Sequence, residues 1–451
     1  MNTTKRNEGQ QRTATPRPTL LAMALYSLSL ISLPVCAAPQ GGVLRAGEAT
    51  IAQSGPSTLI EQRSDRAIID WRSFNVGANE GVQFKQPSKT SATLNRVTGE
   101  QLTLILGRLD ANGQIFLINP HGIVFGQGAQ VNVGSLIAST TNLSDANFMA
   151  GRLHFDQPGQ PGAGIINQGT LSAADGGLIA LVAPHVRNDG LIQARLGKVL
   201  LGAGDTFTLD LYGDGLINLA VTPEHGQALL DATGQPIGSL LTHTGRITAD
   251  GGQVVLITAP AAKAVLDQVI NLSGTIQADT IAQHSGRIVL LGQGGRVDVS
   301  GTLSAQGIQP GQSGGTIDLL GDSVHLASGA RIDASGPSGG GTIHLGGAFQ
   351  GQGTTYRAQT NTIDTGTQLN ADATANGWKF DAKAAEKILT DAGATKGADG
   401  IYSINGTRLG PWKLITPTGW TDWNASCDII AKSCKAIGWY VETYKRAQLS
   451  I

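Results

Sequence analysis

Three acidic residues are the strongest candidates for catalysis in this sequence. Asp298, Asp318 and Asp333 occupy outward-looking positions of predicted strands, about one structural repeat apart. Carboxylates that stack in this way can perform the acid–base chemistry of glycoside cleavage, so a carbohydrate-active enzyme is one interpretation. Single acidic residues on the polar face of a strand are also ordinary solubilising residues, and this second interpretation is favoured.

Other sequence motifs that indicate a catalytic or ligand-binding site are scarce. The eight His residues are scattered, and neither they nor the Cys residues have the spacing of a zinc site. Calcium-binding Gly-Gly-x-Gly-x-Asp repeats and phosphate-binding loops do not occur. Asp210, Asp214 and Gly215 near Tyr212 fit a turn better than a site. We therefore expect no catalytic, cofactor-binding or metal site, and we predict that the chain is not an enzyme.

The composition favours short strands and tight turns. Charged residues make up 14% of the 451 residues and aromatic residues 5%, whereas Gly occurs 62 times. An ordinary globular enzyme carries more charge and more aromatic anchors. The formal net charge of −1 gives no reason to expect a nucleic-acid partner.

Residues 1–37 are predicted to be a signal peptide. A basic stretch precedes an apolar stretch from Leu20 to Leu33, which is about the length that a signal peptide needs. Cleavage after Ala37 would leave Ala38 as the first mature residue. A lipoprotein box at Cys36 is the alternative, but Val35 is bulkier than the residue that usually precedes such a Cys. The basic residues are Lys5, Arg6, Arg12 and Arg17.

Cysteine usage fits an exported chain that stays unfolded in transit. Between Ala38 and Cys427 the sequence contains no Cys. Cys427 and Cys434 are expected on one helix, roughly 10 Å apart, which is too far for a disulfide with each other. An early crosslink would block the threading of the chain through a membrane pore.

Internal repetition is the dominant signal. A Gly-x-aliphatic-x-Ala pattern recurs at Gly169, Gly190, Gly245, Gly274 and Gly301, and the series continues at Ala330 to Ala334. The intervals are 21, 55, 29, 27 and 29 residues, and we interpret the interval of 55 as about two periods across an irregular stretch from 205 to 243. A Gly-x-aliphatic-x-Leu pattern alternates with the first one. Its members begin at Gly252, Gly286, Gly315 and Gly341.

This periodicity predicts an all-β fold, a right-handed parallel β-helix. Alternate residues of a strand point to opposite faces, so the Ile and Ala of Gly-Thr-Ile-Gln-Ala would point inward. A period of 20 to 30 residues with two or three strands is one turn of such a solenoid. Gly and Asn at the corners would supply positive φ angles. A β-sandwich is the alternative, which the regular spacing disfavours.

The chain is expected to have four parts. After the signal peptide, residues 38–165 would form an N-terminal module, whose first segments from Gln40 cap the solenoid, because a bare end is an open sheet edge. Residues 166–376 would form the repeats. Residues 377–451 would form a small α/β fragment, with helices capped by Asp381 and Thr421 and a strand from Lys413 to Thr416.

The stretch from Ile68 to Gly202 resembles the two-partner-secretion, or haemagglutination-activity, domain of the filamentous haemagglutinins. The motif Asn119-Pro120-His121-Gly122-Ile123 has His121 where the family usually has Asn, and both residue types tolerate a turn. The resemblance is carried by Ile68 to Gly77, Phe84 to Ser88, Leu94 to Gly99, Ile105 to Gly107, Ala111 to Gly126, Val131 to Gly134 and Asn167 to Gly169.

This resemblance implies a secreted, adhesin-like exoprotein of a Gram-negative bacterium. Its expected partner is an outer-membrane β-barrel transporter with periplasmic recognition domains, and a host-cell surface or a glycan is a further expected partner. The motif from Asn119 to Ile123 would belong to the region needed for secretion. Its alternative interpretation is a turn with a purely structural role. The location implied is extracellular or cell-surface, reached through the periplasm.

The tail resembles a fragment of the solute-binding proteins of peptide ABC transporters. Because most of both lobes of such a protein is missing, we expect no peptide binding, and a periplasmic peptide-binding protein is the third functional alternative. The resemblance is carried by Phe380 to Leu389, Asp399 to Ile401 and Leu414 to Gly438.

Overall fold

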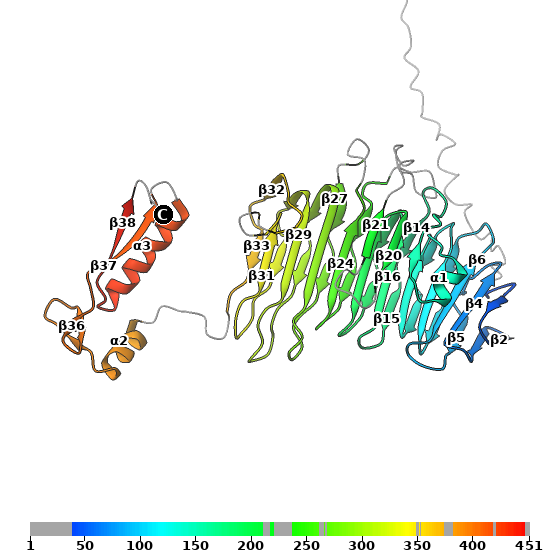
Figure 1. Cartoon of the computed structure of the whole chain (residues 1–451), viewed down its shortest axis with the longest axis horizontal. Helices are drawn as coiled ribbons and strands as arrows, with labels where there is room; N and C mark the ends of the chain where they lie inside the picture. Colours follow the sequence, from blue (N-terminus) through cyan, green and yellow to red (C-terminus); the bar gives the residue numbers. More distant parts are fainter. Residues whose placement is uncertain are drawn as a thin grey trace, which may run out of the picture.

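The protein is a stack of short parallel strands followed by a small α/β tail (Figure 1). This computed structural model describes residues 38–210, 217–220, 237–260, 266, 268–348, 351, 353–373, 382–417 and 421–446. The predicted signal peptide, including Ala37, lies outside these residues, as do Asp214, Gly215 and Asp381.

The stack is a three-sided solenoid, because from β6 onward each coil adds one strand to each of three faces, which we name A, B and C. Along face A each strand pairs in parallel with the one from the coil before. Face A consists of β4 (Arg66–Trp71), β6 (Ala92–Val97), β9 (Gln114–Ile118), β12 (Ser135–Ser139), β16 (Leu178–Ala183), β19 (Lys198–Ala203), β24 (Gln253–Thr258), the first halves of β27 (Arg287–Val299) and β29 (Thr316–Leu326), and β31 (Thr342–Leu345).

Face B is joined to face A, because β27 and β29 run continuously from one face to the other. The two faces therefore form one 18-stranded sheet. Face B consists of β7 (Thr103–Ile105), β10 (Ile123–Phe125), β14 (Gly164–Asn167), β17 (His185–Asn188), β22 (Leu241–His243), β25 (Gln268–Leu272), the second halves of β27 and β29, and β32 (Thr360–Ile363).

Face C belongs to a separate 12-stranded sheet and is parallel from β3 onward. It consists of β3 (Ser57–Gln62), β5 (Gly81–Lys85), β8 (Arg108–Ala111), β11 (Gln130–Val133), β15 (Thr170–Ala173), β18 (Leu191–Gln193), β23 (Arg246–Thr248), β26 (Thr275–Gln277), β28 (Thr302–Ser304), β30 (Arg331–Asp333) and β33 (Gln368–Asn370).

The core consists of aliphatic side chains stacked in columns, as the repeats predict. On face C one column runs in register through the centre of each motif, and its members from Val82 to Ile332 are fully or almost fully buried. Each buried aliphatic side chain stabilises the fold by about 1.5–3 kcal/mol. The parallel β-helix is thereby confirmed. The column is Val82, Leu109, Val131, Leu171, Ile192, Ile247, Ile276, Leu303 and Ile332.

The repeat glycines are required by close approach and not by backbone angle. A Cβ on Gly274 would lie 2.4 Å from the carbonyl oxygen of Gly245, and one on Gly301 would lie 2.0 Å from that of Gly274. None of the five motif glycines has a positive φ, so the prediction that these corners need left-handed conformations is wrong for them. Other corner glycines, such as Gly176 with φ 78° and Gly329 with φ 86°, do have that conformation.

The interval of 55 residues is one coil and not two. β18 pairs directly with β23, so that Ile192 lies beneath Ile247. The extra residues leave the solenoid: β20 (Thr206–Leu209) pairs antiparallel with β13 (His154–Phe155) and with β21 (Ile217–Ala220). An insertion in a solenoid coil can form an outer layer without disturbing the register of its neighbours.

This outer layer lies on face A, whose outward side is also apolar. Phe155 and Phe207 stack at 4.1 Å between ring centroids, and both belong to a second buried cluster with Ile68 and Phe116 of face A. Helix α1 (Asp145–Met149) adds Phe148, whose ring meets Phe116 edge-on at 5.2 Å. Face A is therefore buried on both sides along much of its length, as is typical of parallel sheets.

A cap closes the N-terminal end, as predicted. β1 (Val43–Ala46) pairs antiparallel with β4, and β2 (Ala49–Ser54) forms an antiparallel hairpin with β3. The predicted boundary at residue 165 falls inside β14, which lies between two parallel neighbours. The first coils and the repeats therefore share one continuous sheet.

The tail has the predicted α/β character. Its helices are α2 (Ala382–Asp391) and α3 (Thr421–Ala436), and the predicted strand is β37 (Trp412–Pro417), which pairs in parallel with β38 (Val441–Arg446). α3 begins at Thr421 itself, so Thr421 is the first helical residue and not the cap. A small antiparallel sheet contains β34 (Thr395–Lys396), β35 (Tyr402–Ile404) and β36 (Thr407–Arg408). Among the residues that the structure covers, no helix combines the length and apolar character needed to span a bilayer.

A ladder of buried polar side chains lines the inner corner of face B. The Asn167 Nδ2 donates to Asn188 Oδ1 at 2.7 Å, and Asn188 Nδ2 donates to His243 Nδ1 at 3.0 Å. His243 Nε2 then donates to the carbonyl oxygen of Thr275 at 3.1 Å. Because this arrangement uses one ring nitrogen as acceptor and the other as donor, it fixes His243 as the neutral imidazole.

The ladder predicts a loss of stability at acidic pH. Burial lowers the pKa of His243 from its ordinary value of 6.5, so the unfolded chain takes up this proton more readily than the folded chain. The contribution of His243 is fully present above pH 6.5 and is lost as the pH falls through the folded pKa. Urea unfolding at about pH 7.5 and about pH 5.5 should show a smaller fall for His243→Asn than for the wild type.

The comparison isolates His243 because other titrating groups are the same in both chains. The pKa of His325 is raised, chiefly by its hydrogen bond to Asp298, so its contribution is fully present below the unfolded value and falls as the pH rises. An equal pH dependence in the wild type and in His243→Asn would contradict the neutral ladder.

Candidate functional site

The turn from Asn119 to Ile123 connects β9 to β10, as predicted. Asn119 is completely buried, and its Oδ1 accepts the backbone N–H of His121 at 2.9 Å. The N–H of Gly122 donates to the carbonyl oxygen of Asn119 at 3.1 Å, which closes a β-turn. Ile123 begins β10 with its side chain in the core. The substitution of His121 for the usual Asn therefore leaves the turn intact.

The Asn119 side chain also fixes the turn to the preceding coil. Its Nδ2 donates to the carbonyl oxygen of Gln101 and to Thr103 Oγ1, both at 2.9 Å. The backbone N–H of Asn119 donates to Ser139 of the following coil at 3.0 Å. One residue thus links three successive coils, which a simple solvent-exposed turn would not do.

Two residues of the turn are in constrained surroundings: Gly122 has little space for a side chain, and His121 has a buried polar atom. Gly122 has a φ of 110°, and a Cβ there would lie 3.1 Å from the carbonyl oxygen of Gly164. The Nδ1 of His121 is buried, and no described residue forms a hydrogen bond with it. An unsatisfied buried nitrogen costs about 1–3 kcal/mol, so His121 weakens this turn relative to a residue that satisfies its polar atoms.

A network of buried polar side chains lies inside the first coils. Trp71 Nε1 donates to Asn95 Oδ1 at 3.0 Å, and Gln86 Nε2 donates to Thr93 Oγ1 at 3.0 Å. Thr93 Oγ1 in turn donates to Gln62 Oε1 at 2.5 Å. Fully satisfied networks of this kind specify one arrangement of neighbouring elements. Trp71, Gln86 and Asn95 all belong to segments that carry the haemagglutinin resemblance.

Arg96 connects the first coils to the elements around them. Its guanidinium binds Asp70 Oδ1 at 3.3 Å and Asp145 Oδ1 of α1 at 2.6 Å, and its Nε donates to Asn142 Oδ1 at 3.0 Å. Asp70 also binds Arg45 of the cap at 2.7 Å. The cap, the first two coils and α1 therefore meet at one ion cluster, and sequence reasoning did not single it out.

The cap presents open strand edges. β2 is the terminal strand of the 12-stranded sheet, and β1 pairs only with β4 among the strands that the structure describes. Val43 and Leu44 of β1 are 49% and 38% exposed. An exposed edge with apolar side chains is a ready template for an added strand from another protein.

The three candidate carboxylates do not form a site. Asp298 aligns with His325, Asp318 with Val289 and His344, and Asp333 with Ser304, so they occupy three different columns. Each is engaged by basic or hydroxyl side chains, and Asp318 and Asp333 are buried. The prediction that they stack together is wrong. Their contacts are Arg296 and His325 for Asp298, Arg287 and His344 for Asp318, and Arg331 and Ser335 for Asp333.

Another carboxylate pair does lie on adjacent coils. The N–H of Asp279 donates to Asp250 Oδ1 at 2.9 Å, and burial raises the pKa of Asp279 above its usual range. Both oxygens of Asp250 accept from Gln277, and Asp279 Oδ1 accepts from Ser304 and from the backbone N–H of Gln306. These bonds connect corners of successive coils, so the pair is part of the scaffold.

Two serine motifs also lie at corners. Residues 311–315 and 336–340 match Gly-x-Ser-x-Gly, which in hydrolases places the Ser on a turn between a strand and a helix. Each motif in this chain directly precedes a strand, β29 and β31 respectively, so neither forms that elbow. Within the described parts of the chain, no group of three or more His, Cys, Asp or Glu residues is placed to hold a metal ion.

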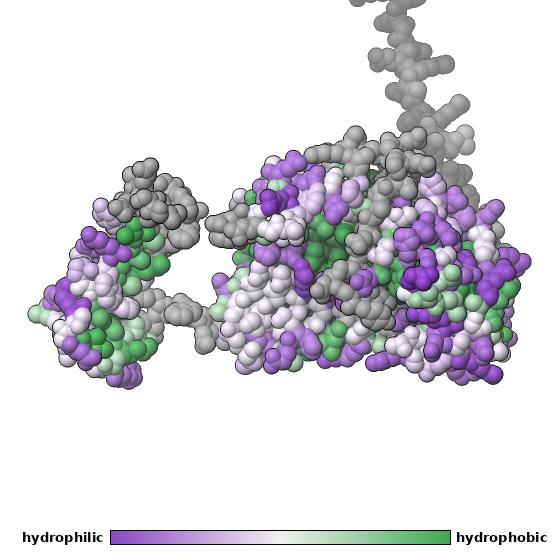
Figure 2. All heavy atoms as spheres, in the orientation of Figure 1, coloured by the Kyte–Doolittle hydropathy of each residue, from purple (hydrophilic) through white to green (hydrophobic). Residues whose placement is uncertain are grey.

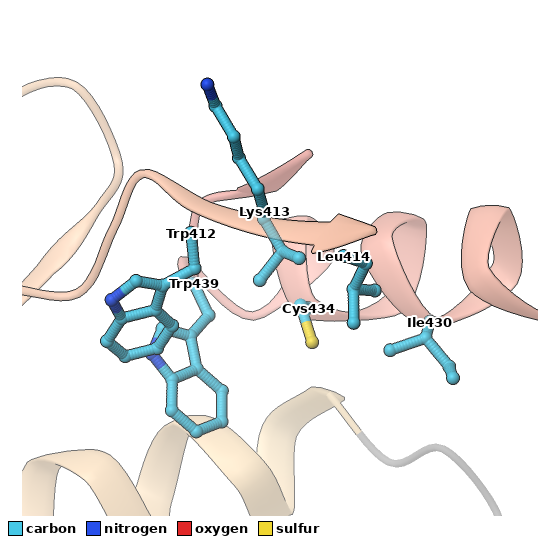
Figure 3. A pocket seen from close by; sticks show the side chains of 7 residues that line it. Trp412, Lys413, Leu414, Ile430, Cys434 and Trp439 are labelled. Atoms are coloured by element: carbon cyan, nitrogen blue, oxygen red, sulfur yellow. The ribbon is translucent and has the colours of Figure 1, made fainter. Parts of the chain in front are cut away.

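The tail contains a small apolar hollow beside α3. Figure 3 shows Trp412, Ile430, Cys434 and Trp439 around it, and its volume is about 230 Å³. Ligand sites usually exceed about 300 Å³ and include convergent polar groups. Cys427 and Cys434 are both free, as predicted. Figure 2 shows hydrophobic residues gathered on the tail, and the structure gives no observation that favours peptide binding there.

Comparisons with known proteins agree with the fold. A family model described as a TPS secretion domain matches residues 37–305. The crystal structure of the HMW1 secretion domain from Haemophilus influenzae aligns with a TM-score of 0.63 and 34% identity, covering 74% of this chain and 84% of that one.

Two curated relatives are much longer than this chain. The heme/hemopexin-binding protein of Haemophilus influenzae strain ATCC 51907 / DSM 11121 / KW20 / Rd is 34% identical over 231 residues, which are 47% of this chain and 25% of that protein. A second Haemophilus influenzae protein of the same name is 26% identical over 389 residues, which are 78% of this chain and 40% of that protein.

Proposed function

Because this chain belongs to the TPS secretion domain family, we propose that it is an exoprotein of a Gram-negative bacterium, exported by a partner outer-membrane β-barrel transporter. The observation that carries the proposal is the match of residues 37–305 together with the capped β-helix that the described residues of this range form. Signal-peptide cleavage after Ala37 and release of a chain that begins at Ala38 are part of the proposal.

Strand addition is the proposed mode of transporter recognition. The segments that form β1 and β2 leave the inner membrane first, before the coils that they later cap. While extended, they offer backbone N–H and C=O groups to the periplasmic domains of the transporter. The same segments end as edge strands in the folded protein, so their side chains suit an extended conformation with one free edge.

Folding outside the cell would then draw the chain outward. Each completed coil buries aliphatic side chains against the coil before it, and the burial of one such residue is worth about 1.5–3 kcal/mol. The turn from Asn119 to Ile123 is placed early in this process. Because Asn119 bonds to the coils before and after it, the turn fixes the register of the first full coils.

An export assay with matched glycine variants tests the role of the turn. Gly122→Ala forces a side chain into a positive φ at a cost of about 1–2 kcal/mol, and Gly176→Ala also places a side chain at a positive φ, 78°, outside the turn, where a Cβ meets nothing within 4 Å. With the cognate transporter present, we expect Gly122→Ala and Asn119→Ala to reduce the exported fraction strongly. Gly176→Ala and His121→Asn should remain near wild type.

A second measurement distinguishes a loss of export from a loss of folding stability. Refolding of each purified variant reports its stability independently of the transporter. Wild-type export of both Gly122→Ala and Asn119→Ala would remove the turn from the export mechanism. Secretion that persists without the transporter would overturn the proposed route itself.

After export, we propose an adhesin-like role at the bacterial surface, with a host-cell surface or a glycan as the contact. The support is membership of the family. The chain spans 25% and 40% of the two curated relatives, which are named for heme and hemopexin binding, and neither relative is named as an enzyme. We propose accordingly that the chain is not an enzyme.

A further inference from the structure

The two ends of the solenoid differ. At the first end, β1 and β2 cover the coil with antiparallel strands. At the other end, β31, β32 and β33 form the last coil, and no described strand pairs with their outer edges. The core columns continue into this coil. Leu326 and Ile332 are completely buried, whereas their next neighbours in register, Ile363 and Leu369, are 49% and 43% exposed.

A solenoid end with open strand edges and exposed apolar side chains is expected to pack against another segment or another protein. Its exposed backbone edges and apolar side chains are a template for another chain, and native edge strands usually carry charged residues that block such pairing. The eleven residues of β31, β32 and β33 include no Asp, Glu, Lys or Arg. The three strands of the last coil therefore lack the charged residues that usually protect an open edge.

We propose that this end docks onto the same end of a second copy, so that the protein forms a two-fold dimer in which the two solenoids meet end to end. With the two-fold axis through the middle of β33, each β33 pairs antiparallel with its copy around Leu369. The same rotation places β31 of one copy against β32 of the other, also antiparallel.

The side chains suit this pairing. Leu369 meets Leu369 of the partner subunit, and Gln368 lies opposite Asn370 of the partner subunit. Side-chain amides both donate and accept hydrogen bonds, so Gln and Asn complement each other directly. Because the three strands carry no acidic or basic residue apart from His344, no pair of like formal charges is brought together.

A second copy of the chain fits the exposed last coil better than the tail of the same chain does. The two copies present the same outline, so the apolar columns of one continue into those of the other. The described strands of the tail already pair with one another in two small sheets, β34–β36 and β37–β38, so they do not provide a strand for each of the three faces. The dimer is independent of the export route, because it requires only the folded chain.

Oligomeric state tests the proposal in the full mature chain. Sedimentation velocity should show a concentration-dependent dimer, and Leu369→Lys and Ile363→Lys should each raise the dissociation constant by at least about tenfold. Leu102→Lys, at a residue 39% exposed beside β7, is the matched control and should leave the dimer unchanged. Circular dichroism confirms that the variants remain folded.

A crosslink tests the geometry. Directly opposed residues of antiparallel strands have Cβ atoms about 4.5–5.5 Å apart, so Leu369→Cys should form a disulfide with its copy after small adjustment. The background is Cys427→Ser/Cys434→Ser, and Leu102→Cys should not crosslink. A wild-type chain that is monomeric at about 100 μM, or a dimer disrupted by Ile430→Lys in the tail but not by Leu369→Lys, would overturn the proposal.

Discussion

Gly274→Ala is expected to lower the free energy of unfolding by at least about 3 kcal/mol, because it places a side chain where two coils touch. This loss is larger than that from a typical overpacked core substitution. A Cβ on Gly274 would lie 2.4 Å from the carbonyl oxygen of Gly245, and the carbonyl oxygen of Gly274 lies 2.0 Å from the position that a Cβ on Gly301 would take. Backbone hydrogen bonds hold these coils at a fixed spacing, so the chain cannot open locally without breaking ladders on both sides.

Urea unfolding followed by circular dichroism measures this effect. Gly238→Ala is the matched control, because a Cβ at Gly238 meets nothing within 4 Å, and its stability should stay within about 0.5 kcal/mol of wild type. Equal unfolding midpoints for Gly274→Ala and Gly238→Ala would show that the repeat glycine serves no steric purpose, and that close approach of the coils is not the reason for the motif.

The repeats made the solenoid predictable, because each motif describes contacts with its own copy one coil away. Ile276 packs between Ile247 and Leu303, so the pattern that recurs in sequence also recurs in space. The insertion between β19 and β22 broke this rule. Nothing in residues 205–243 distinguishes a second degenerate coil from an excursion, since both contain short strands.

The outer layer on face A could not be predicted for a related reason. In β9, Ile115 and Leu117 point into the solenoid while Phe116 and Ile118 point outward, yet all four are buried. A strand buried on both sides reads as a continuous apolar run, which does not reveal what covers its second side. The cover consists of α1, β13 and β20, which contribute Phe148, Phe155 and Phe207 to this cluster from positions distant in sequence from β9.

Parts of the candidate site were predictable to different degrees. The turn at Asn119 is local, and its Asx and Gly chemistry can be derived from five residues. The bonds from Asn119 to Gln101 and Thr103 depend on the stacking of coils, and so does the network around Trp71 and Asn95. Such residues carried the family resemblance, but their physical role became evident only when the register was known.

Arg96→Ala is expected to lower the free energy of unfolding by about 3 kcal/mol or more. This would be the largest loss for any partly exposed residue of the first coils. The Arg96 side chain is 16% exposed and Asp70 is 12% exposed, so removal of the guanidinium leaves a largely buried carboxylate with one remaining partner, Arg45. α1 loses its link through Asp145 as well. Arg96→Lys keeps the charge but not the forked geometry, and should recover only part of the loss.

Arg108→Ala is the matched control for this prediction. Arg108 pairs with Asp110 within its own strand, and its side chain is 64% exposed, so its removal should cost less than about 1 kcal/mol. Urea unfolding measures both losses, and limited proteolysis reports whether β1 and α1 detach before the coils unfold. If Arg96→Ala and Arg108→Ala unfold at the same urea concentration, then the cap, the first coils and α1 are held by packing alone, and the ion cluster adds nothing to their association.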